Sequence, residues 1–171
     1  TETMIILGGN PMASNGSVWT VPDFRNRAKA LQKRGGQLVV IDPRRTETAK
    51  IADRHLFIRP ATDGLLLVAL LKAVLTHPER PALPDYIDNL DAVAEAVSGF
   101  DSGACAAQCG VALPDIEWLA DRMVTGPAAL YGRIGAATQS FGTLNAWLIG
   151  LINIASGQLD REGGLLFPTP L

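Results

Sequence analysis

Two glycines and an asparagine follow the first apolar run of the sequence. Gly8, Gly9 and Asn10 come directly after residues 4–7, which are wholly apolar. Because glycine has no side chain, backbone N–H groups here can approach a ligand closely, and the Asn10 amide can donate and accept hydrogen bonds. A plain turn after a strand would use the same residues. The spacing is not GxGxxG and the next expected helix begins only near residue 23, so the sequence disfavours pyrophosphate seated on a helix N-terminus, as in an ordinary NAD domain.

A carboxylate and two guanidinium groups follow the second apolar run, which ends at residue 41. Asp42 stands where a carboxylate commonly accepts hydrogen bonds from the ribose hydroxyls of a nucleotide. Arg44 and Arg45 could pair with phosphate or stack on a base. The alternative is that Asp42 begins a turn and that both arginines are solvated.

Thr62 and Asp63 precede an apolar helix expected over residues 64–76. Guanine presents adjacent N1–H and N2–H donors, and one carboxylate can accept both, whereas adenine lacks that pair. Asp63 could therefore read a guanine edge. Thr62 or Asp63 could instead be simply the N-cap of the helix, and the two roles do not exclude each other.

The elements that would position these residues alternate between strand and helix. Apolar runs predict strands over residues 4–7, 37–41, 55–58 and 128–131, and helical periodicity predicts helices over 23–34, 46–52, 64–76, 84–100, 114–125 and 143–156. Residues 14–21 and 132–142 are expected to be loops, 101–111 fits neither pattern, and no element is expected after Gly157. Gly35 and Gly157 fit helix C-caps, and the basic residues of 23–34 are expected to face solvent.

This alternation predicts a three-layer α/β fold with a mostly parallel, Rossmann-like sheet and helices on both faces. Crossovers should be right-handed. The strand exits at residues 8–10, 42–45 and 61–63 should then converge near the point where the strand order reverses.

The composition limits the class of protein. A chain of 171 residues with 47% apolar and 19% charged residues suits one globular domain with a real core. The net charge of -2 gives no general attraction to nucleic acid. No apolar stretch reaches the roughly 20 residues of a membrane helix, so no direct membrane insertion is expected.

Few residues offer catalytic or metal-binding chemistry. Cys105 and Cys109 are too few for a disulfide framework, and their spacing would place them on one face of a helix, where burial of two small residues is the simpler interpretation. Only His55 and His77 could add metal ligands, and no Ser–His–Asp or Cys–His arrangement stands out. The sequence therefore assigns no catalytic and no metal-ligating residue.

Several motifs occur together in an order that resembles the molybdopterin oxidoreductase family, which contains formate dehydrogenases, nitrate reductases and dimethyl sulfoxide reductase. The motifs are GGNP at residues 8–11 with Ser14, IDPRRTETAK at 41–50, AD at 52–53, IRPATD at 58–63, and the stretch 132–145 followed by Gly157 and Gly163-Gly164. The resemblance covers nearly the whole chain. It implies the formate dehydrogenase/DMSO reductase type of the α/β fold.

Members of this family hold a bis(molybdopterin guanine dinucleotide) cofactor whose dithiolenes bind Mo or W. The residues that would line one guanosine diphosphate are Gly8, Gly9, Asn10 and Ser14. The residues that would meet its ribose and guanine are Asp42 and Arg44, with Ile41 also counted as cofactor-binding, and Asp63 with Thr62 at the guanine edge. The residues that would lie closer to the pterin and metal are Gly135, Thr138 and Gln139.

The sequence departs from the family pattern at three places. Ala61 stands where the family often has Gly, which restricts the backbone. The family usually has Gln near residue 138, where ungapped matching puts Thr138 and a shift by one residue puts Gln139. Residues 158–162 match only loosely a family loop rich in Gly, Arg and Pro.

In the family, an iron–sulfur segment and the Cys, selenocysteine or Ser ligand to the metal precede this region, and a further cofactor-binding domain follows it. The chain is therefore expected to be a single domain excerpted from a larger multidomain oxidoreductase and inactive alone. Its partners would be the N- and C-terminal parts of the same enzyme and an electron-transfer subunit, and the cytoplasm is favoured over the periplasm. The whole enzyme would carry out a two-electron reaction on a small substrate and pass electrons to an iron–sulfur cluster.

Two other interpretations stay open. A nucleotide-binding domain of a thiamine-diphosphate or NAD/FAD enzyme shares parallel sheets and Gly-Asn loops, and fold alone does not separate it from the first interpretation. A stand-alone structural or interaction domain would bind no nucleotide. The run at residues 41–49 favours the guanine-nucleotide interpretation.

Overall fold

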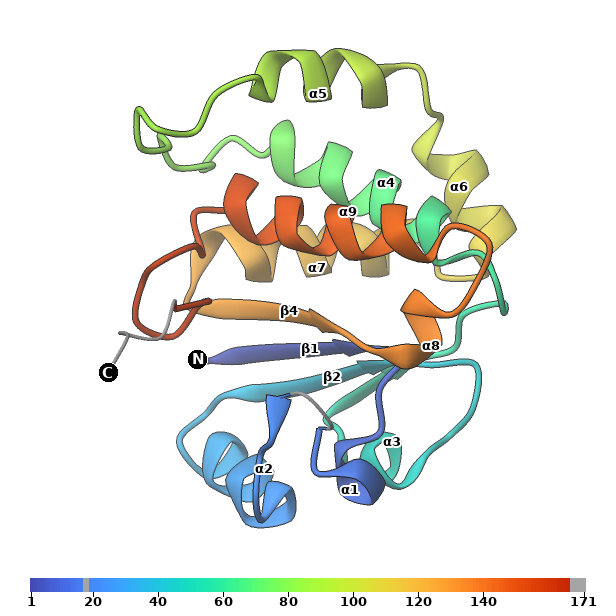
Figure 1. Cartoon of the computed structure of the whole chain (residues 1–171), viewed down its shortest axis with the longest axis vertical. Coiled ribbons are helices and arrows are strands. Elements are labelled where there is room, and N and C mark those ends of the chain that lie inside the picture. Colours follow the sequence, from blue (N-terminus) through green and yellow to red (C-terminus); the bar gives the residue numbers. More distant parts are fainter. Residues whose placement is uncertain (17–18, 167–171) are drawn as a thin grey trace.

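Four short strands form one parallel sheet in the computed structural model, which describes residues 1–16 and 19–166 (Figure 1). The strands are β1 (Thr3–Leu7), β2 (Gln37–Ile41), β3 (Arg54–Leu56) and β4 (Ala128–Gly132). Their order is β3-β2-β1-β4, and each pairing is parallel. The chain steps outward from β1 to β3 and returns to the other side of β1, so the strand order reverses between β1 and β4. Ligands of such sheets bind at this point, beyond the carboxyl ends of the strands.

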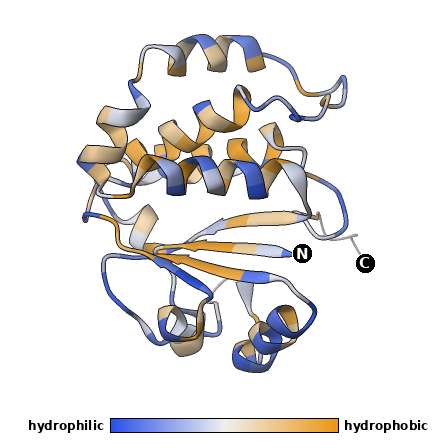
Figure 2. Cartoon of the chain, turned by 180° about the vertical axis from the view of Figure 1, so that it is seen from behind, coloured by the Kyte–Doolittle hydropathy of each residue, from blue (hydrophilic) through white to orange (hydrophobic). Residues whose placement is uncertain are grey.

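Alternating side chains of the strands build a separate core on each face of the sheet. Ile5 and Leu7 of β1 are fully buried in the larger core, whereas Met4 and Ile6 belong to the smaller one. Figure 2 shows the strands as a hydrophobic layer between two sets of helices. The predicted three-layer α/β fold is confirmed.

The larger core is covered by helices that surround α4. They are α4 (Asp63–Leu75), α5 (Leu90–Ser98), α6 (Ser102–Cys109), α7 (Leu113–Thr125) and α9 (Gly142–Ala155), with α5 on the outside of α4 (Figure 1). Leu66, Leu67, Leu70 and Leu71 of α4 are completely buried. Each such side chain stabilises the fold by about 1.5–3 kcal/mol, so the start of α4 has a firm position next to the sheet edge.

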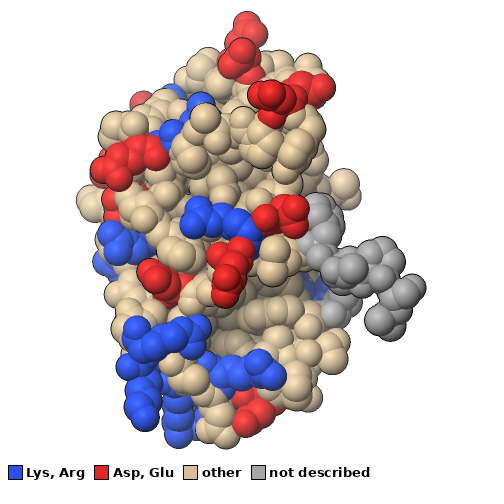
Figure 3. All heavy atoms as spheres, turned by 90° about the vertical axis from the view of Figure 1, so that its left-hand side faces the viewer, with Lys and Arg blue, Asp and Glu red and all other residues tan. Residues whose placement is uncertain are grey.

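The smaller core lies under α1 (Pro11–Ser14), α2 (Phe24–Lys33) and α3 (Glu47–Ile51). Phe24, Ala28 and Leu31 turn toward the sheet. The basic residues of α2 are exposed, as predicted, and Figure 3 shows Lys and Arg side chains gathered at the end of the molecule where α2 lies.

The outer edge of β4 forms hydrogen bonds with side chains instead of with another strand. Asn153 accepts a hydrogen bond from Leu130 N at 3.0 Å and donates one to Leu130 O at 2.9 Å. Gln158 accepts from Ala128 N at 3.1 Å. Both side chains are fully buried. These bonds satisfy backbone groups that an open sheet edge would otherwise leave unpaired.

Several predicted boundaries were wrong. Two one-turn helices occur where none was expected: α1 at residues 11–14, and α8 (Ile134–Ala137) within the stretch 132–142 that was predicted to be a loop. The helix predicted over 84–100 begins only at Leu90, because Asn89 has a left-handed φ of 60°. The third strand is Arg54–Leu56 rather than residues 55–58.

The segment over residues 101–111 holds α6, whose ends carry local signals. Asp101 accepts a hydrogen bond from Ala104 N at 2.6 Å as the N-cap, and Gly110 ends the helix at φ 80°. The predicted C-caps are confirmed by positive φ angles of 87° at Gly35 and 74° at Gly157.

Among the described helices, none is long and apolar enough to cross a bilayer. The prolines near the end of the sequence, Pro168 and Pro170, lie outside the described residues.

Candidate nucleotide-binding site

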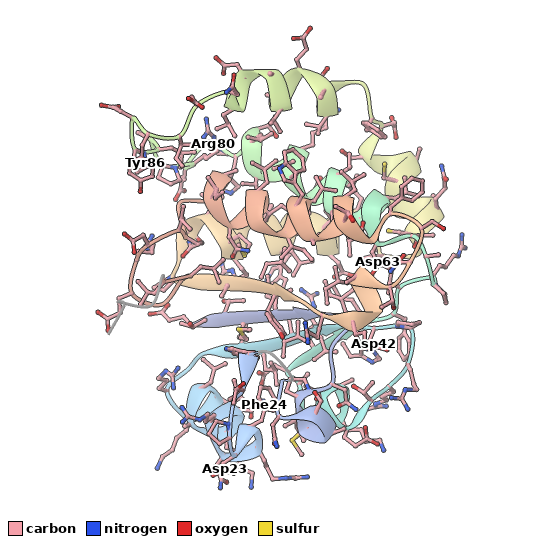
Figure 4. The ribbon with its side chains drawn as sticks, in the orientation of Figure 1. Asp23, Phe24, Asp42, Asp63, Arg80 and Tyr86 are labelled. Carbon is pink, nitrogen blue, oxygen red and sulfur yellow. The ribbon has the colours of Figure 1, made fainter. Side chains whose placement is uncertain are left out.

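Loops at the carboxyl edge of the sheet enclose a cavity of about 420 Å³. The loops follow β1, β2, β3 and β4, so the cavity lies where the strand order reverses. The sequence-predicted residues that line it are Gly8, Asn10, Asp42, Arg44, Asp63, Gly135 and Gln139. Figure 4 shows Asp42 and Asp63 at this same end of the sheet. The predicted convergence of the strand exits is therefore confirmed.

The loop after β1 turns sharply at Gly8, which has a φ of 61°. Gly8 N donates to Ile41 O at 3.0 Å, and Gly8 O accepts from Gly135 N at 3.0 Å. A Cβ atom at Gly8 would lie only 2.7 Å from Ala136 N. Glycine is thus required here by both conformation and space, and the loops after β1 and β4 are in direct backbone contact.

The Asn10 side chain joins this first loop to α3. Its Oδ1 accepts from Thr48 Oγ1 at 2.7 Å and from Thr48 N at 3.2 Å, and its Nδ2 donates to Glu47 Oε2 at 2.8 Å. The bond from Asn10 is the main reason that the pKa of Glu47 lies below its ordinary value. Asn10 therefore lines the cavity with an amide that already bonds within the protein. The premise that no helix follows this loop closely was wrong, because α1 begins at Pro11.

Asp42 opens a turn, as one interpretation of the sequence held. Its Oδ1 accepts from Arg44 N at 2.8 Å, and its backbone oxygen lies 3.0 Å from His55 Nε2. The Arg44 side chain is exposed and lines the cavity, whereas Arg45 is exposed and does not line it. The turn places one carboxylate and one guanidinium group in the same wall of the cavity.

Asp63 brings a nearly buried carboxylate to the opposite wall, with 5% of its surface exposed. Burial raises its pKa above the ordinary value, and the neighbouring Asp42 charge adds to the effect. A hydrogen bond from Gln139 Nε2 to Asp63 Oδ2, 2.7 Å long, opposes this pKa shift. The carboxylate thus faces the cavity with an amide as its side-chain partner.

The helix-cap interpretation is confirmed for the position of Thr62 but not for its hydrogen bonding. Thr62 occupies the N-cap position of α4 but its side chain makes no cap bond, since its Oγ1 donates to Arg59 O at 2.7 Å. Asp63 is the first residue of α4, where a negative charge interacts favourably with the helix dipole. The preceding Ala61 has a left-handed φ of 66°, which turns the loop into the cavity wall.

Similar proteins share this segment. No family model matches the chain. The assimilatory nitrate reductase of Haloferax mediterranei is 31% identical over 170 residues, which cover 95% of this chain and 22% of that protein. The nitrate reductase of Klebsiella oxytoca is 28% identical over 167 residues, which cover 95% of this chain and 18% of that protein. Over nearly its whole length, the chain is similar to one segment of these molybdopterin oxidoreductases.

The fold agrees with that relationship. Acetylene hydratase from Pelobacter acetylenicus superposes with a TM-score of 0.74 at 22% identity, over 91% of this chain and 21% of that chain. The chain spans about a fifth of the length of these molybdopterin oxidoreductase relatives.

The remaining predicted residues of the molybdopterin oxidoreductase motifs do not line the cavity. Gly9 is buried against Ile6, and Ile41 lies in the larger core. Thr62 is half-buried at the start of α4, and exposed Ser14 bonds back to Asn10 O at 3.2 Å. Contact of these residues with a cofactor stays a prediction.

The structure distinguishes the two candidates for the family's Gln. Gln139 lines the cavity and bonds to Asp63. Thr138 is exposed, and its Oγ1 donates to Ile134 O at 2.7 Å. Gln139, which corresponds to the family's Gln only after a shift of one residue, is therefore the candidate that lies at the site.

Some lining residues were missed by the sequence reasoning. They are Thr46, Ile58, Pro60 and Ile134. Each lies inside a quoted motif, so membership of a motif was the available signal.

Neither cysteine belongs to the site. Cys105 and Cys109 are buried on α6, as predicted, and burial raises the pKa of both thiols. His55 packs its ring 4.1 Å from that of Phe57. Within residues 1–16 and 19–166, no three His, Cys, Asp or Glu side chains are grouped to hold a metal ion.

Proposed function

We propose that this chain binds the guanosine diphosphate part of a bis(molybdopterin guanine dinucleotide) cofactor, as a segment of a molybdenum or tungsten oxidoreductase. The Asp63 carboxylate carries the proposal. It is 5% exposed, yet it lines a cavity of about 420 Å³ at the switch point of the sheet. A buried carboxylate without a charged partner is costly, and a base with two adjacent N–H donors would offset that cost.

The other walls of the cavity suit the rest of a guanosine diphosphate. Gly8 lines the cavity with backbone alone, and the loop after β4 fills the space where its side chain would lie. Asp42 lies at the end of β2, the usual position for a ribose contact, and Arg44 supplies a cation for the diphosphate. The volume falls in the range of about 300–1,000 Å³ that ligand sites commonly have.

The remainder of the cofactor would extend toward Gly135 and Gln139, in the wall after β4. When bound, its metal supplies two-electron redox chemistry, while the residues of this chain hold and orient the nucleotide end. The proposal places the metal ligand, an iron–sulfur cluster and a further cofactor-binding domain in other parts of the same enzyme, with an electron-transfer subunit as a partner.

An adenine dinucleotide would use the site differently. Asp42 could accept hydrogen bonds from its ribose hydroxyls in the same manner. Adenine, however, presents an acceptor beside its exocyclic amine, so it leaves the buried Asp63 carboxylate without a matching pair of donors. The position of Asp63 therefore favours guanine over the adenine of an NAD or FAD site.

Calorimetric titration of the chain with GDP, ADP and NAD tests this choice. We expect binding of GDP in preference to both adenine nucleotides. Preference for ADP or NAD without any response to GDP would count against the proposal.

The variant Asp63→Asn tests the role of the carboxylate. It loses an acceptor and turns a donor toward the guanine donors, so GDP binding should weaken by about 1–3 kcal/mol. Asp91→Asn is the matched control, because Asp91 also lies in the first turn of a helix, α5, away from the cavity. Equal GDP affinity in wild type and Asp63→Asn would leave Asp63 only a role in α4.

A further inference from the structure

The Gln139 amide makes two hydrogen bonds at the cavity wall. Its Nε2 donates to Asp63 Oδ2 at 2.7 Å and to Gly135 O at 2.7 Å. A primary amide nitrogen carries two N–H groups, so both donors of Gln139 are engaged. Among the described residues, Gln139 is the side-chain partner of the Asp63 carboxylate.

The bond between Gln139 and Asp63 has the same chemistry as the proposed bond between guanine and Asp63. In both cases a planar amide-type nitrogen donates to the carboxylate. Gln139 and Asp63 line the same cavity, so a base bound to Asp63 would compete with the Gln139 side chain for Oδ2. A base with two donors replaces the bond that is lost and adds another.

The segment that carries Gln139 can release its side chain without unfolding the core. It follows the four-residue helix α8, whose residues Ile134 and Gly135 are exposed. The inner side of α8 stays attached through Gly135 N to Gly8 O at 3.0 Å and Asn145 Nδ2 to Ala136 O at 2.9 Å. Rotation of the Gln139 side chain breaks neither of these bonds.

We propose that Gln139 is a placeholder for the guanine base: it occupies the Asp63 carboxylate in the nucleotide-free chain and is displaced when the nucleotide binds. The inference rests on the proposed function. The placeholder keeps a buried carboxylate hydrogen-bonded before the cofactor arrives, and it lowers the apparent affinity for guanine nucleotides, because part of the population must first open. Displacement frees the Gln139 amide for the part of the cofactor beyond the guanosine.

Removal of the placeholder should tighten GDP binding. In Gln139→Ala we expect the dissociation constant for GDP to fall roughly tenfold, the order expected when one competing hydrogen bond to a charged group is lost. Gln139→Asn keeps the amide but is one methylene shorter, so it should behave in the same way. Gln108→Ala is the control, since Gln108 is exposed on α6 and does not line the cavity, and its GDP affinity should equal that of wild type. Weaker or unchanged GDP binding in Gln139→Ala overturns the inference.

NMR of the Gln139 side-chain amide separates this inference from the proposed function. In the nucleotide-free protein, Asp63→Ala should shift the Gln139 amide resonances toward those of a solvated amide, and GDP saturation of the wild type should shift them in the same direction. Suppose that GDP binds and that Asp63→Asn weakens GDP binding, but that GDP does not shift the Gln139 resonances. The placeholder role of Gln139 is then wrong, and the proposed function stands. If neither wild type nor Gln139→Ala binds GDP, the proposed function fails and the placeholder fails with it.

Discussion

Gly8 and Gly135 lie in such close contact that neither position has room for a side chain: a Cβ atom on Gly135 would lie 2.9 Å from Gly8 Cα and 2.9 Å from Gly8 O. This contact joins the loop after β1 to the loop after β4, on the two sides of the point where the strand order reverses. It fixes the distance between the wall that would hold the guanosine and the wall that would face the pterin.

The first prediction concerns that contact. Gly135→Ala should lower the free energy of unfolding by about 1–3 kcal/mol, because the added methyl group overlaps backbone atoms that have no freedom to rotate away. Gly150→Ala is the matched control. Gly150 also lies in a helix, α9, but nothing lies within 4 Å of an added Cβ. The control should be neutral or stabilising by up to about 1 kcal/mol. Urea denaturation of both variants measures the difference, and equal stability would contradict the contact.

The second prediction concerns the pH dependence of stability at Asp63. Burial raises the pKa of Asp63 above the ordinary value of 3.8, so the folded protein binds this proton more tightly than the unfolded chain. The stabilisation from Asp63 is therefore fully present below pH 3.8 and is lost as pH rises through the raised pKa. Asp63→Asn has no such proton.

The measurement is urea denaturation of wild type and Asp63→Asn at a series of pH values. The free energy of unfolding of wild type minus that of the variant should decrease as pH rises. The two curves together remove the contributions of the other carboxylates, which both proteins share. A difference that stays constant or increases with pH would show that the carboxyl group is not penalised by burial.

The third prediction concerns the bridge between Asn10 and α3. Asn10→Ala leaves Thr48, which is fully buried, without its acceptor, and should lower the free energy of unfolding by about 1–3 kcal/mol. It should also return the pKa of Glu47 upward toward its ordinary value of 4.5, because the bond from Asn10 is what mainly lowers it. Asn26→Ala is the control, since Asn26 is exposed and its side chain bonds to Asp23. Carboxyl NMR titration of Glu47 gives the second readout, and an unchanged Glu47 pKa would exclude the bridge.

The strands and their exits could be predicted because their signals are local. Apolar runs end at Gly8 and Asp42, and the chain direction in a parallel sheet brings such exits to one edge. The short helices α1 and α8 could not be predicted, since one turn has no periodicity and is not stable alone. Tertiary bonds hold them instead, such as Met12 N to Thr48 Oγ1 at 3.1 Å and Gly135 N to Gly8 O at 3.0 Å.

The residue types of the site could be predicted, but not the direction of their side chains. Asn10 was expected to meet a ligand, yet its amide bonds to residues 47 and 48, far along the chain. The partner of Asp63, Gln139, is 76 residues away. Asn153 interrupts an apolar stretch and Gln158 follows its end without any local reason, and only the fold shows that they pair with the edge of β4. Pairings of this kind depend on the tertiary structure and leave no pattern in the neighbouring sequence.

The last prediction concerns Ala61, where the family often has Gly. Its φ of 66° lies in the left-handed region, which costs a residue with a Cβ atom about 1–2 kcal/mol relative to glycine. Glycine loses more backbone entropy on folding, by roughly 0.5–1 kcal/mol, so Ala61→Gly should raise the free energy of unfolding by up to about 1 kcal/mol. Ala61→Val should lower it, because a β-branched residue tolerates this conformation least. Urea denaturation gives the order Gly, Ala, Val from most to least stable, and the reverse order would mean that the loop before Asp63 does not have a left-handed turn at this position.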